Sequence, residues 1–423
     1  MIALVDCNNF YVSCERVFQP QYNNQPVVVL SNNDGCVISR SEEAKVVGIP
    51  MGAPEFKIQN VIQQNNIKVF SSNYTLYGDL SCRVMTLLKK FAPATEVYSI
   101  DEAFLDYTGV QNKCFFTEGL LIQHTVNKGL GIPTCIGFAQ TKTLAKMANR
   151  IAKKFKERTQ GVYVIDTDEK RIKALKWTKI QDVWGIGHRL ASKLQQRNIL
   201  TALDFIQAQH YKFIEKTMGV VGLRLVNELS GKSNLAFEDS VSTAKKNIAI
   251  TRSFESKLSN LDDLTERIST FSSICSQKLR NQNSCCYSLL VFIQENKYDS
   301  TTENYHHSTI VTLPFATNSA LTLGNAALQA LKEIYIPNKK YVKAGVIVMQ
   351  LIAQNQKQFN LFDEEDARHQ KLMLAIDQIN NKLGSRKIRI ANQDLVRTWK
   401  MKQNHLSPSF TTNIHDIIKV KCI

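Results

Sequence analysis

No run of eighteen or more apolar residues occurs in the sequence, so we expect no segment to span a membrane as a helix. The chain begins Met-Ile-Ala-Leu-Val-Asp, without the basic leader and cleavage site of a secretory signal. Its ten cysteines include no Cys-x-x-Cys pair, which argues against structural zinc and for reduced thiols. Internal repeats are also absent. These absences favour a cytoplasmic protein without disulfides.

The charge is distributed unevenly along the chain. Lys and Arg outnumber Asp and Glu by 53 to 37, yet residues 1–110 contain 8 basic and 11 acidic residues. The whole positive excess therefore lies after residue 110. Counterion release would attract such a surface to a polyanion such as DNA. A basic but solvated surface without that partner fits the charge equally well.

At 423 residues the chain is too long for one hydrophobic core, and about two to four domains are expected. Strand and helix patterns alternate at first, and the pattern is helical throughout from 168 to 235. Strand patterns then return, with helical stretches between them. The predicted strands are 1–5, 27–30 with a return strand at 36–39, a pair within 95–106 with a turn near 100–102, 131–139, 247–254, 285–294, 308–313 and 343–352. The predicted helices outside 168–235 are 41–47, 115–126, 141–155, 260–280 and 320–334. An α+β multidomain protein is therefore expected.

Acidic residues stand in two apolar segments. Asp6 follows Ile-Ala-Leu-Val, and Asp101 and Glu102 lie inside Tyr-Ser-Ile-Asp-Glu-Ala-Phe. Such acids are costly unless they are paired, hydrogen-bonded or bound to cations. Three carboxylates converging from neighbouring strands, with the backbone carbonyl of Cys7, suit two Mg²⁺ ions about 4 Å apart. Spacing alone leaves the alternative that these acids are caps or salt-bridge partners.

Four segments carry a more specific signal, in this order along the chain: residues 6–11 (DCNNFY), 26–29 (PVVV), 98–106 (YSIDEAFLD) and 137–146 (GFAQTKTLAK). Together they resemble the Y-family of translesion DNA polymerases, and the resemblance covers essentially the whole chain. Residues 31–38 (SNNDGCVI) and 70–74 (FSSNY) are similar to one branch of that family. The resemblance to that branch implies association with a processed UmuD dimer and with RecA.

The resemblance implies a right-hand polymerase. Its parts would be a palm at 1–167 with a small fingers insertion at about 18–75, a helical thumb at 168–235, a little finger at 241–352, and a clamp-binding linker and C-terminal region at 353–423. The implied function is error-prone, template-directed synthesis past lesions in the SOS response, on primer–template DNA and dNTP, with two Mg²⁺ ions. The implied location is the bacterial cytoplasm at the nucleoid. A small fingers region makes few checks on base-pair shape. The sequence contains no second cluster of carboxylates that would indicate a proofreading exonuclease.

The resemblance also assigns the catalytic centre and the sugar pocket. Asp6, Asp101 and Glu102 match the metal-binding acids, whereas Asp106 is expected to be structural. Tyr11 matches the steric gate that excludes a ribose 2′-hydroxyl. Phe10 lies beside it at the nucleotide site, although core packing is the safer expectation for that ring.

The triphosphate would be held by basic and hydroxyl side chains. Lys45 and Lys153 match positions that contact the incoming triphosphate, and Ser39 matches a hydroxyl position nearby. The sequence departs from the family at two positions. The family often has Arg where this chain has Lys45, and Tyr where this chain has Glu42. Arg40 is the candidate that would substitute for the missing contact. Without the resemblance, these lysines are ordinary exposed helix charges.

Residues 182–191 (DVWGIGHRLA) resemble a helix–hairpin–helix, in which Gly185 and Gly187 let backbone N–H groups approach a DNA phosphate. A tight turn between helices is the alternative, and Trp184 is expected in the core. In the little finger, the phosphate candidates are Lys245, Lys246 and Arg252.

Residues 358–362 (QFNLF) resemble the pentapeptide by which bacterial polymerases bind the β sliding clamp. Leu361 and Phe362 would enter an apolar pocket while Gln358 bonds to backbone. Burial of both residues in the protein itself is the alternative.

Three other functions stay open at this point. A non-catalytic DNA-binding or checkpoint protein at stalled forks would not need the three acids. A nucleotide cyclase shares a palm-like metal site but has no use for a hairpin motif or a clamp peptide. A single-subunit lesion polymerase would need no accessory protein.

Overall fold

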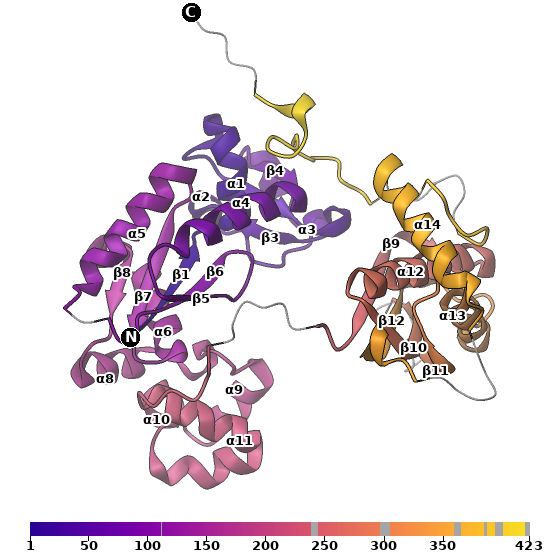
Figure 1. The fold of residues 1–423 in the computed structure, drawn as a ribbon. Coiled ribbons are helices and arrows are strands. Elements are labelled where there is room, and N and C mark those ends of the chain that lie inside the picture. Colours follow the sequence, from indigo (N-terminus) through magenta and orange to yellow (C-terminus); the bar gives the residue numbers. More distant parts are fainter. Residues whose placement is uncertain are drawn as a thin grey trace, which may run out of the picture. The chain divides into compact units, whose positions relative to one another are not determined.

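In the part of the chain that the structure describes, three β-sheets are present, two in a first unit and one in a second (Figure 1). The computed structural model describes residues 1–110, 112–237, 244–296, 305–358, 365–384, 387–393 and 401–418. The first unit is Met1–Val241 together with Gln403–Ile423, and the second is Ser242–Lys402. Among the described residues, no helix is both long enough and apolar enough to cross a bilayer.

The palm of the first unit is a five-stranded sheet of order β5-β6-β1-β7-β8. Its strands are β1 (Ile2–Cys7), β5 (Ala94–Val97), β6 (Glu102–Asp106), β7 (Thr134–Ala139) and β8 (Val162–Val164). Every residue of the central strand β1 is buried, as its continuous apolar run predicts. The turn before β6 spans residues 98–101. The expected position near 100–102 was therefore wrong by about one residue, because Glu102 is already paired in the ladder.

Helices cover both faces of the palm sheet. Residues 3, 5 and 7 of β1 pack with α1 (Phe10–Phe18), α4 (Tyr74–Leu88) and α5 (Phe115–Leu130). Residues 2 and 4 pack on the other side with α6 (Lys142–Lys154). Side chains alternate along a strand, so Asp6 belongs to the α6 side.

Helix α6 lies very close to the sheet at Gly137 of β7. A Cβ atom at this position would come within 2.1 Å of the backbone nitrogen of Asn149. Only glycine permits this approach. The close packing holds the basic face of α6 against the end of β1.

The fingers contain a three-stranded sheet of order β3-β2-β4, with its own small core. Strand β2 (Val27–Leu30) is antiparallel to β3 (Val37–Arg40) and parallel to β4 (Lys68–Ser71). Helices α2 (Glu42–Val46) and α3 (Glu55–Gln64) belong to this part.

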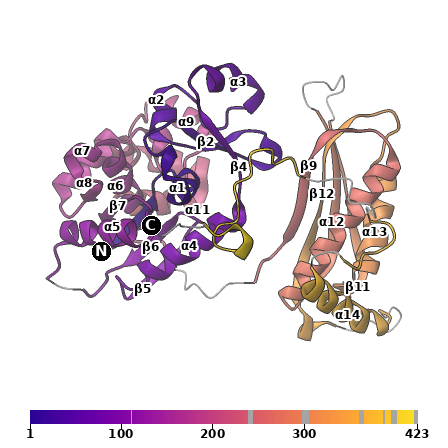
Figure 2. The same ribbon diagram turned by 90° about the horizontal axis from the view of Figure 1, so that it is seen from above.

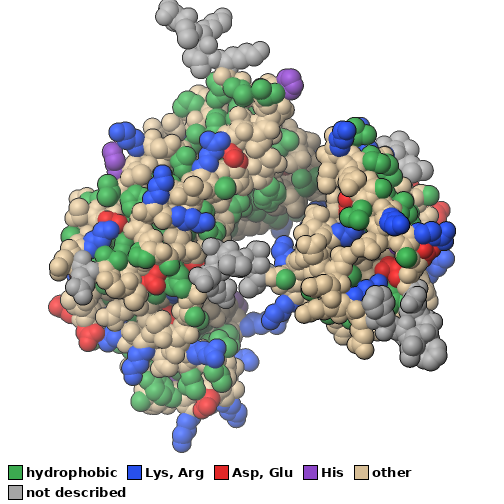
Figure 3. All heavy atoms as spheres, in the orientation of Figure 1, with side chains coloured by type: hydrophobic (Ala, Val, Ile, Leu, Met, Phe, Trp, Pro, Cys, Tyr) green, Lys and Arg blue, Asp and Glu red, His purple; other side chains and the backbone are tan. Residues whose placement is uncertain are grey.

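Residues 168–229 form short helices joined by loops, as predicted, whereas residues 230–235 are turn and loop. The helices are α8 (Asp168–Trp177), α9 (His188–Gln195), α10 (Ala202–Phe205) and α11 (Tyr211–Leu229), and α7 (Lys156–Thr159) precedes them. Their buried residues share one hydrophobic cluster with α6. Lys and Arg side chains stand out over this helical region on the face shown in Figure 3.

The second unit is built on a four-stranded sheet of order β11-β10-β12-β9. Its strands are β9 (Ile248–Leu258), β10 (Ser284–Glu295), β11 (His306–Thr317) and β12 (Tyr341–Ala353). Helices α12 (Leu261–Asn281) and α13 (Ala320–Ile334) lie side by side on the sheet (Figure 2), and α14 (Arg368–Leu383) follows. Each strand and helix expected between 247 and 352 is present, which confirms the α+β fold class. Short 3-10 turns lie at Pro20–Tyr22, Asn32–Asp34, Ile180–Asp182, Ala208–His210, Gln354–Gln356 and Ile414–Asp416.

Candidate active site

Asp6 and Glu102 form the centre of the candidate site. They are direct partners in the antiparallel register of β1 and β6, so their side chains leave the same face of the sheet. Their carboxyl groups are close enough to interact electrostatically. Burial raises the pKa of Asp6 to about 7, an effect that Lys153 opposes and Glu102 reinforces. Two acids so close together need positive charge beside them.

Two lysines of α6 supply that charge. Lys153 Nζ lies 2.5 Å from Asp6 Oδ1, and Lys146 Nζ lies 2.9 Å from Glu102 Oε2. Residues 146, 150 and 153 recur at helical spacing, so all three project toward the same side of the helix. Arg150 between them pairs with Asp182 at 2.8 Å.

Asp101 is held differently from the other two acids. Its carboxylate accepts a hydrogen bond from the Ser99 hydroxyl at 2.6 Å, and its carbonyl accepts from the Cys7 amide at 2.9 Å. Asp101 also acts electrostatically on Tyr11 and on Cys7. The structure thus brings Asp6 and Glu102 together and leaves Asp101 beside them, bonded to its own turn.

The donor set fits a hard divalent cation, but it does not form a closed cage. Within the described ranges, no three His, Cys, Asp or Glu side chains are arranged to hold a metal ion. Carboxylate oxygens are the ligands that Mg²⁺ prefers, and Asp6 and Glu102 already share one patch of negative charge. In this arrangement the ammonium groups of Lys146 and Lys153 stand where a metal ion would otherwise balance that charge.

A cavity of about 330 Å³ opens beside these acids. It is lined by Asp6, Glu102, Lys146, Lys153 and Trp184, among others. Lys146 lies over the rings of both Tyr98 and Trp184, at 4.5 and 5.2 Å from their centres. Trp184 is half-buried rather than in the deep core. Lys146 was not singled out from the sequence, although it ends the segment 137–146 that carries the resemblance.

Tyr11 is the second residue of α1 and lies in a group of aromatic rings. Its ring stacks on Tyr77 with centroids 4.5 Å apart and planes 15° apart, and it meets Tyr74 edge-on at 6.1 Å. Phe10 is only 3% exposed and belongs to the palm core, as the safer expectation had it. Tyr11 itself is half-buried, so one part of its ring stays accessible.

The residues expected at the triphosphate are partly engaged with one another. Lys45 pairs with Glu42 at 2.5 Å, and Glu42 also accepts a hydrogen bond from Asn9 at 3.1 Å. Arg40 donates through Nη1 to the carbonyl of Ile49, which anchors its guanidinium within the fingers. Ser39 is buried on β3. Lys45 and Glu42 therefore form a pair at the place where the sequence departs from the family.

The hairpin motif has the open backbone that phosphate contact needs. Gly185 has a φ of +92°, which favours glycine, whereas Gly187 has φ −81° and precedes α9 as its N-cap. A Cβ atom at either glycine would meet nothing within 4 Å. Both glycines are exposed.

The residues expected to contact DNA or the clamp after residue 240 differ in their exposure. Lys245 and Lys246 are exposed just before β9, and Arg252 is half-buried on that strand. Gln358 is exposed after the Gln354–Gln356 turn. Leu361 and Phe362 lie outside the described residues.

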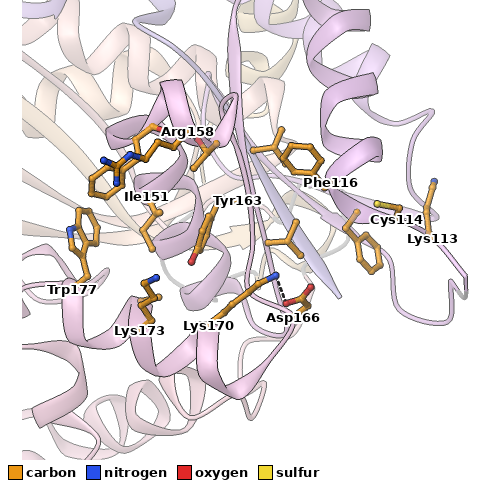
Figure 4. Close-up of a pocket in the computed structure, with 16 residues that line it drawn as sticks. Lys113, Cys114, Phe116, Ile151, Arg158, Tyr163, Asp166, Lys170, Lys173 and Trp177 are labelled. Carbon is orange, nitrogen blue, oxygen red and sulfur yellow. Dashed lines mark hydrogen bonds and ion pairs between the residues drawn. The ribbon is translucent and has the colours of Figure 1, made fainter.

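A larger cavity, of about 670 Å³, lies on the palm away from the acids (Figure 4). Phe116, Tyr163 and Trp177 line it, and the ion pair between Lys170 and Asp166 crosses its rim at 2.8 Å. None of the expected site residues lines this cavity.

The fold is that of solved Y-family DNA polymerases. A chimeric Y-family DNA polymerase made from Dbh and Dpo4 has a TM-score of 0.67 and 24% identity to this chain, and the match covers 83% of this chain and 99% of that one. Residues 5–150 match the impB/mucB/samB family, residues 245–361 match that family's C-terminal domain, and residues 370–420 match a domain of unknown function.

Full-length relatives narrow the assignment. Protein UmuC of Salmonella typhimurium is 39% identical over 424 residues, covering 100% of both chains. Protein ImpB of Salmonella typhimurium is 38% identical, covering 99% of both chains. The chain belongs to the impB/mucB/samB family and is a translesion DNA polymerase of the UmuC type.

Proposed function

We propose that Asp6, Asp101 and Glu102 form the catalytic centre and bind two Mg²⁺ ions during nucleotidyl transfer. The observation that carries this proposal is the cross-strand pair of Asp6 and Glu102. The negative charge of each acid is balanced by a lysine. Asp101 completes the set once its carboxylate exchanges the hydroxyl of Ser99 for a metal ion. The backbone carbonyl of Cys7, which follows Asp6 on β1, is the further ligand.

Bound to these acids, the two ions would place positive charge beside the triphosphate and lower the pKa of the primer 3′-hydroxyl. The protein's own residues then orient the nucleotide. Lys45 and Lys153 bind triphosphate oxygens, and Ser39 and Arg40 on β3 are the additional candidates. Lys153, which now pairs with Asp6, would be available to phosphate if a cation were held at that acid.

Tyr11 selects deoxyribonucleotides in this proposal. Its ring is fixed by stacking on Tyr77, so it presents a rigid surface under the sugar. A ribose 2′-hydroxyl would collide with that surface. Phe10 supports the gate from the core.

DNA is held by the later parts of the chain. The exposed backbone at Gly185 and Gly187 donates to phosphate, and Lys245, Lys246 and Arg252 add charge contacts in the second unit. Gln358, Leu361 and Phe362 bind the β sliding clamp. A processed UmuD dimer and RecA are the proposed activating partners, and the nucleoid in the cytoplasm is the proposed location.

Primer extension across a template lesion tests the catalytic centre, with and without processed UmuD. We expect Asp101→Asn and Glu102→Gln to lower the rate by about a hundredfold or more, because each removes charge that cations require. Asp106→Asn is the matched control on the same strand, since Asp106 only bonds Thr108 in the following turn. Wild-type rates for Asp101→Asn would instead favour a non-catalytic DNA-binding protein. Strong synthesis without processed UmuD would indicate a single-subunit polymerase.

A further inference from the structure

A C-terminal segment, residues 403–410, lies against the fingers and palm of the first unit; we call it the C-terminal strap. The strap bonds the end of β4 through main-chain groups. The Ser71 amide donates to the His405 carbonyl at 3.0 Å, and the His405 amide donates to the Ser71 hydroxyl at 3.0 Å. The side chain of Gln403 donates to the Ser72 carbonyl at 3.1 Å. An extended peptide that bonds a strand end in this way is held by backbone as well as side chains.

Asn73 is the main receptor of the strap. Its amide group donates to the carbonyl of Ser407 at 3.1 Å, to the hydroxyl of Ser407 at 3.1 Å and to the carbonyl of Pro408 at 3.3 Å. Its side-chain oxygen accepts from the Leu76 amide at 3.2 Å and so caps α4. One side chain therefore ties the strap to the start of a palm helix.

Two polar segments that carry no catalytic role receive the strap. Ser71, Ser72 and Asn73 are at most 4% exposed, and Asp34 is 6% exposed. Asp34 accepts a hydrogen bond from the Asn404 amide at 2.8 Å. Buried polar groups are costly without partners, so Asp34 and residues 71–73 suit a surface that the strap covers. These residues belong to the segments 31–38 and 70–74, which resemble one branch of the family.

The strap also reaches the aromatic group at the sugar gate. Glu15 is fully buried, and its Oε1 accepts from the Ser407 hydroxyl at 2.9 Å and from the Tyr77 hydroxyl at 2.6 Å. Tyr77 in turn stacks on Tyr11. Glu15 lies one helical turn after Tyr11 on α1. Burial raises the pKa of Glu15, so this carboxyl depends on the hydroxyl groups that bond to it.

Aromatic packing fixes the strap on its other side. Phe410 stacks on Phe18 with ring centroids 4.9 Å apart and planes 11° apart. Phe410 packs against the palm core, and Ser407 is only 5% exposed. Ser407 and Phe410 therefore anchor the strap in the first unit, whereas residues 404–406 and 408 are exposed.

We propose that the C-terminal strap is a positioning element for sugar selection. It fixes Glu15, Glu15 fixes the hydroxyl of Tyr77, and the Tyr77 ring holds Tyr11 in place. Part of the region matched to a domain of unknown function thereby gains a role in the polymerase itself. The proposal rests on the proposed gate function of Tyr11.

Sugar selection in the full-length protein tests the coupling. Ser407→Ala removes the bond to Glu15, and Tyr77→Phe removes the other bond while keeping the stacked ring. We expect both to raise the ratio of kcat/KM for ribonucleotides to that for deoxyribonucleotides by about threefold or more. Ser409→Ala, two residues along the same strap, is the matched control and leaves the ratio unchanged. A ratio that stays at the wild-type value in both test variants overturns the proposal.

Hydrogen exchange tests docking independently of synthesis. Asn73→Asp keeps an oxygen that caps α4 but removes the amide donors to the strap. We expect faster exchange at Ser71 and at 404–405, with the amides of α4 still protected. Unchanged exchange at those amides overturns the docking arrangement. Faster exchange with an unchanged sugar ratio overturns the coupling to Tyr11. The proposed function fails separately, through Tyr11→Ala leaving sugar selection intact.

Discussion

Asp6 on β1 and Glu102 on β6 lie directly opposite each other in the ladder, and each is paired with a lysine of the same helix. Gly137 makes this arrangement possible, because α6 can approach the sheet closely only where no Cβ intervenes. Two acids and two ammonium groups thus form one compact charge cluster. A divalent cation entering that cluster has to compete with the lysines.

This competition predicts opposite effects of one substitution on stability and on metal response. Lys146→Met leaves Glu102 unpaired, so the metal-free protein should unfold at a temperature a few degrees lower than the wild type. Each kcal/mol of lost stability lowers the unfolding temperature by about 2–4 °C. Added Mg²⁺ should then raise the unfolding temperature more than it does in the wild type. Thermal unfolding with and without Mg²⁺ measures both effects. Lys154→Met, on the same helix but exposed, is the control; an equal Mg²⁺ shift in all three proteins would contradict a metal site at Glu102.

The gate assignment predicts a specific change in sugar choice. Tyr11→Ala removes the ring that stacks on Tyr77 and opens space under the sugar. Ribonucleotide incorporation should rise by about tenfold or more relative to deoxyribonucleotide incorporation. Single-nucleotide kinetics with matched dNTP and rNTP measure the ratio. Tyr11→Phe keeps the ring and should keep the selectivity; sugar choice unaffected by the alanine variant would show that the gate lies elsewhere.

The ion pair between Lys45 and Glu42 predicts that one substitution will strengthen nucleotide binding. Glu42→Gln releases Lys45 for the triphosphate, so the KM for dNTP should fall. The pair is exposed, with side-chain exposures of 36% and 72%, so we expect a change of about fivefold or less that weakens with added salt. Steady-state kinetics at two salt concentrations measure it. Glu43→Gln, whose acid pairs with Arg16 instead, is the control, and a KM that rises in Glu42→Gln would mean that Glu42 itself supports the nucleotide site.

Local patterns in the sequence predicted the strands of the second unit and those of the palm except β8, because burial imposes a period that each strand shows on its own. The two acids of the ladder were found for the same reason: Asp6 and Glu102 interrupt apolar runs. The partners of those acids were harder to see. Lys146 and Lys153 have helical spacing, but only the docking of α6 at Gly137 places them on the acids.

The C-terminal strap was beyond local patterns altogether. Asn73 and Ser407 are 334 residues apart, and each alone reads as an ordinary turn or loop residue. Their burial follows from the contact between them, which no periodicity records. The helices α1, α3, α4, α7 and α14 and the strands β4 and β8 were also missed. Helix α4 begins with polar and aromatic residues, and α14 lies in a segment with little apolar periodicity. Polar contacts between residues far apart in the sequence could therefore not be predicted from local patterns.

The pentapeptide at 358–362 predicts a loss of clamp response without a loss of catalysis. Replacing Leu361 and Phe362 by Ala removes the apolar side chains that would enter the clamp's pocket, whereas Gln358 is exposed and keeps its backbone contact. Stimulation by the β sliding clamp should disappear, and extension without the clamp should stay within about twofold. Primer extension with and without the clamp measures both rates, and Asn360→Ala in the same pentapeptide is the control. An equal fall in both rates would mean that the two apolar residues pack within the protein, because lost core burial lowers every activity together.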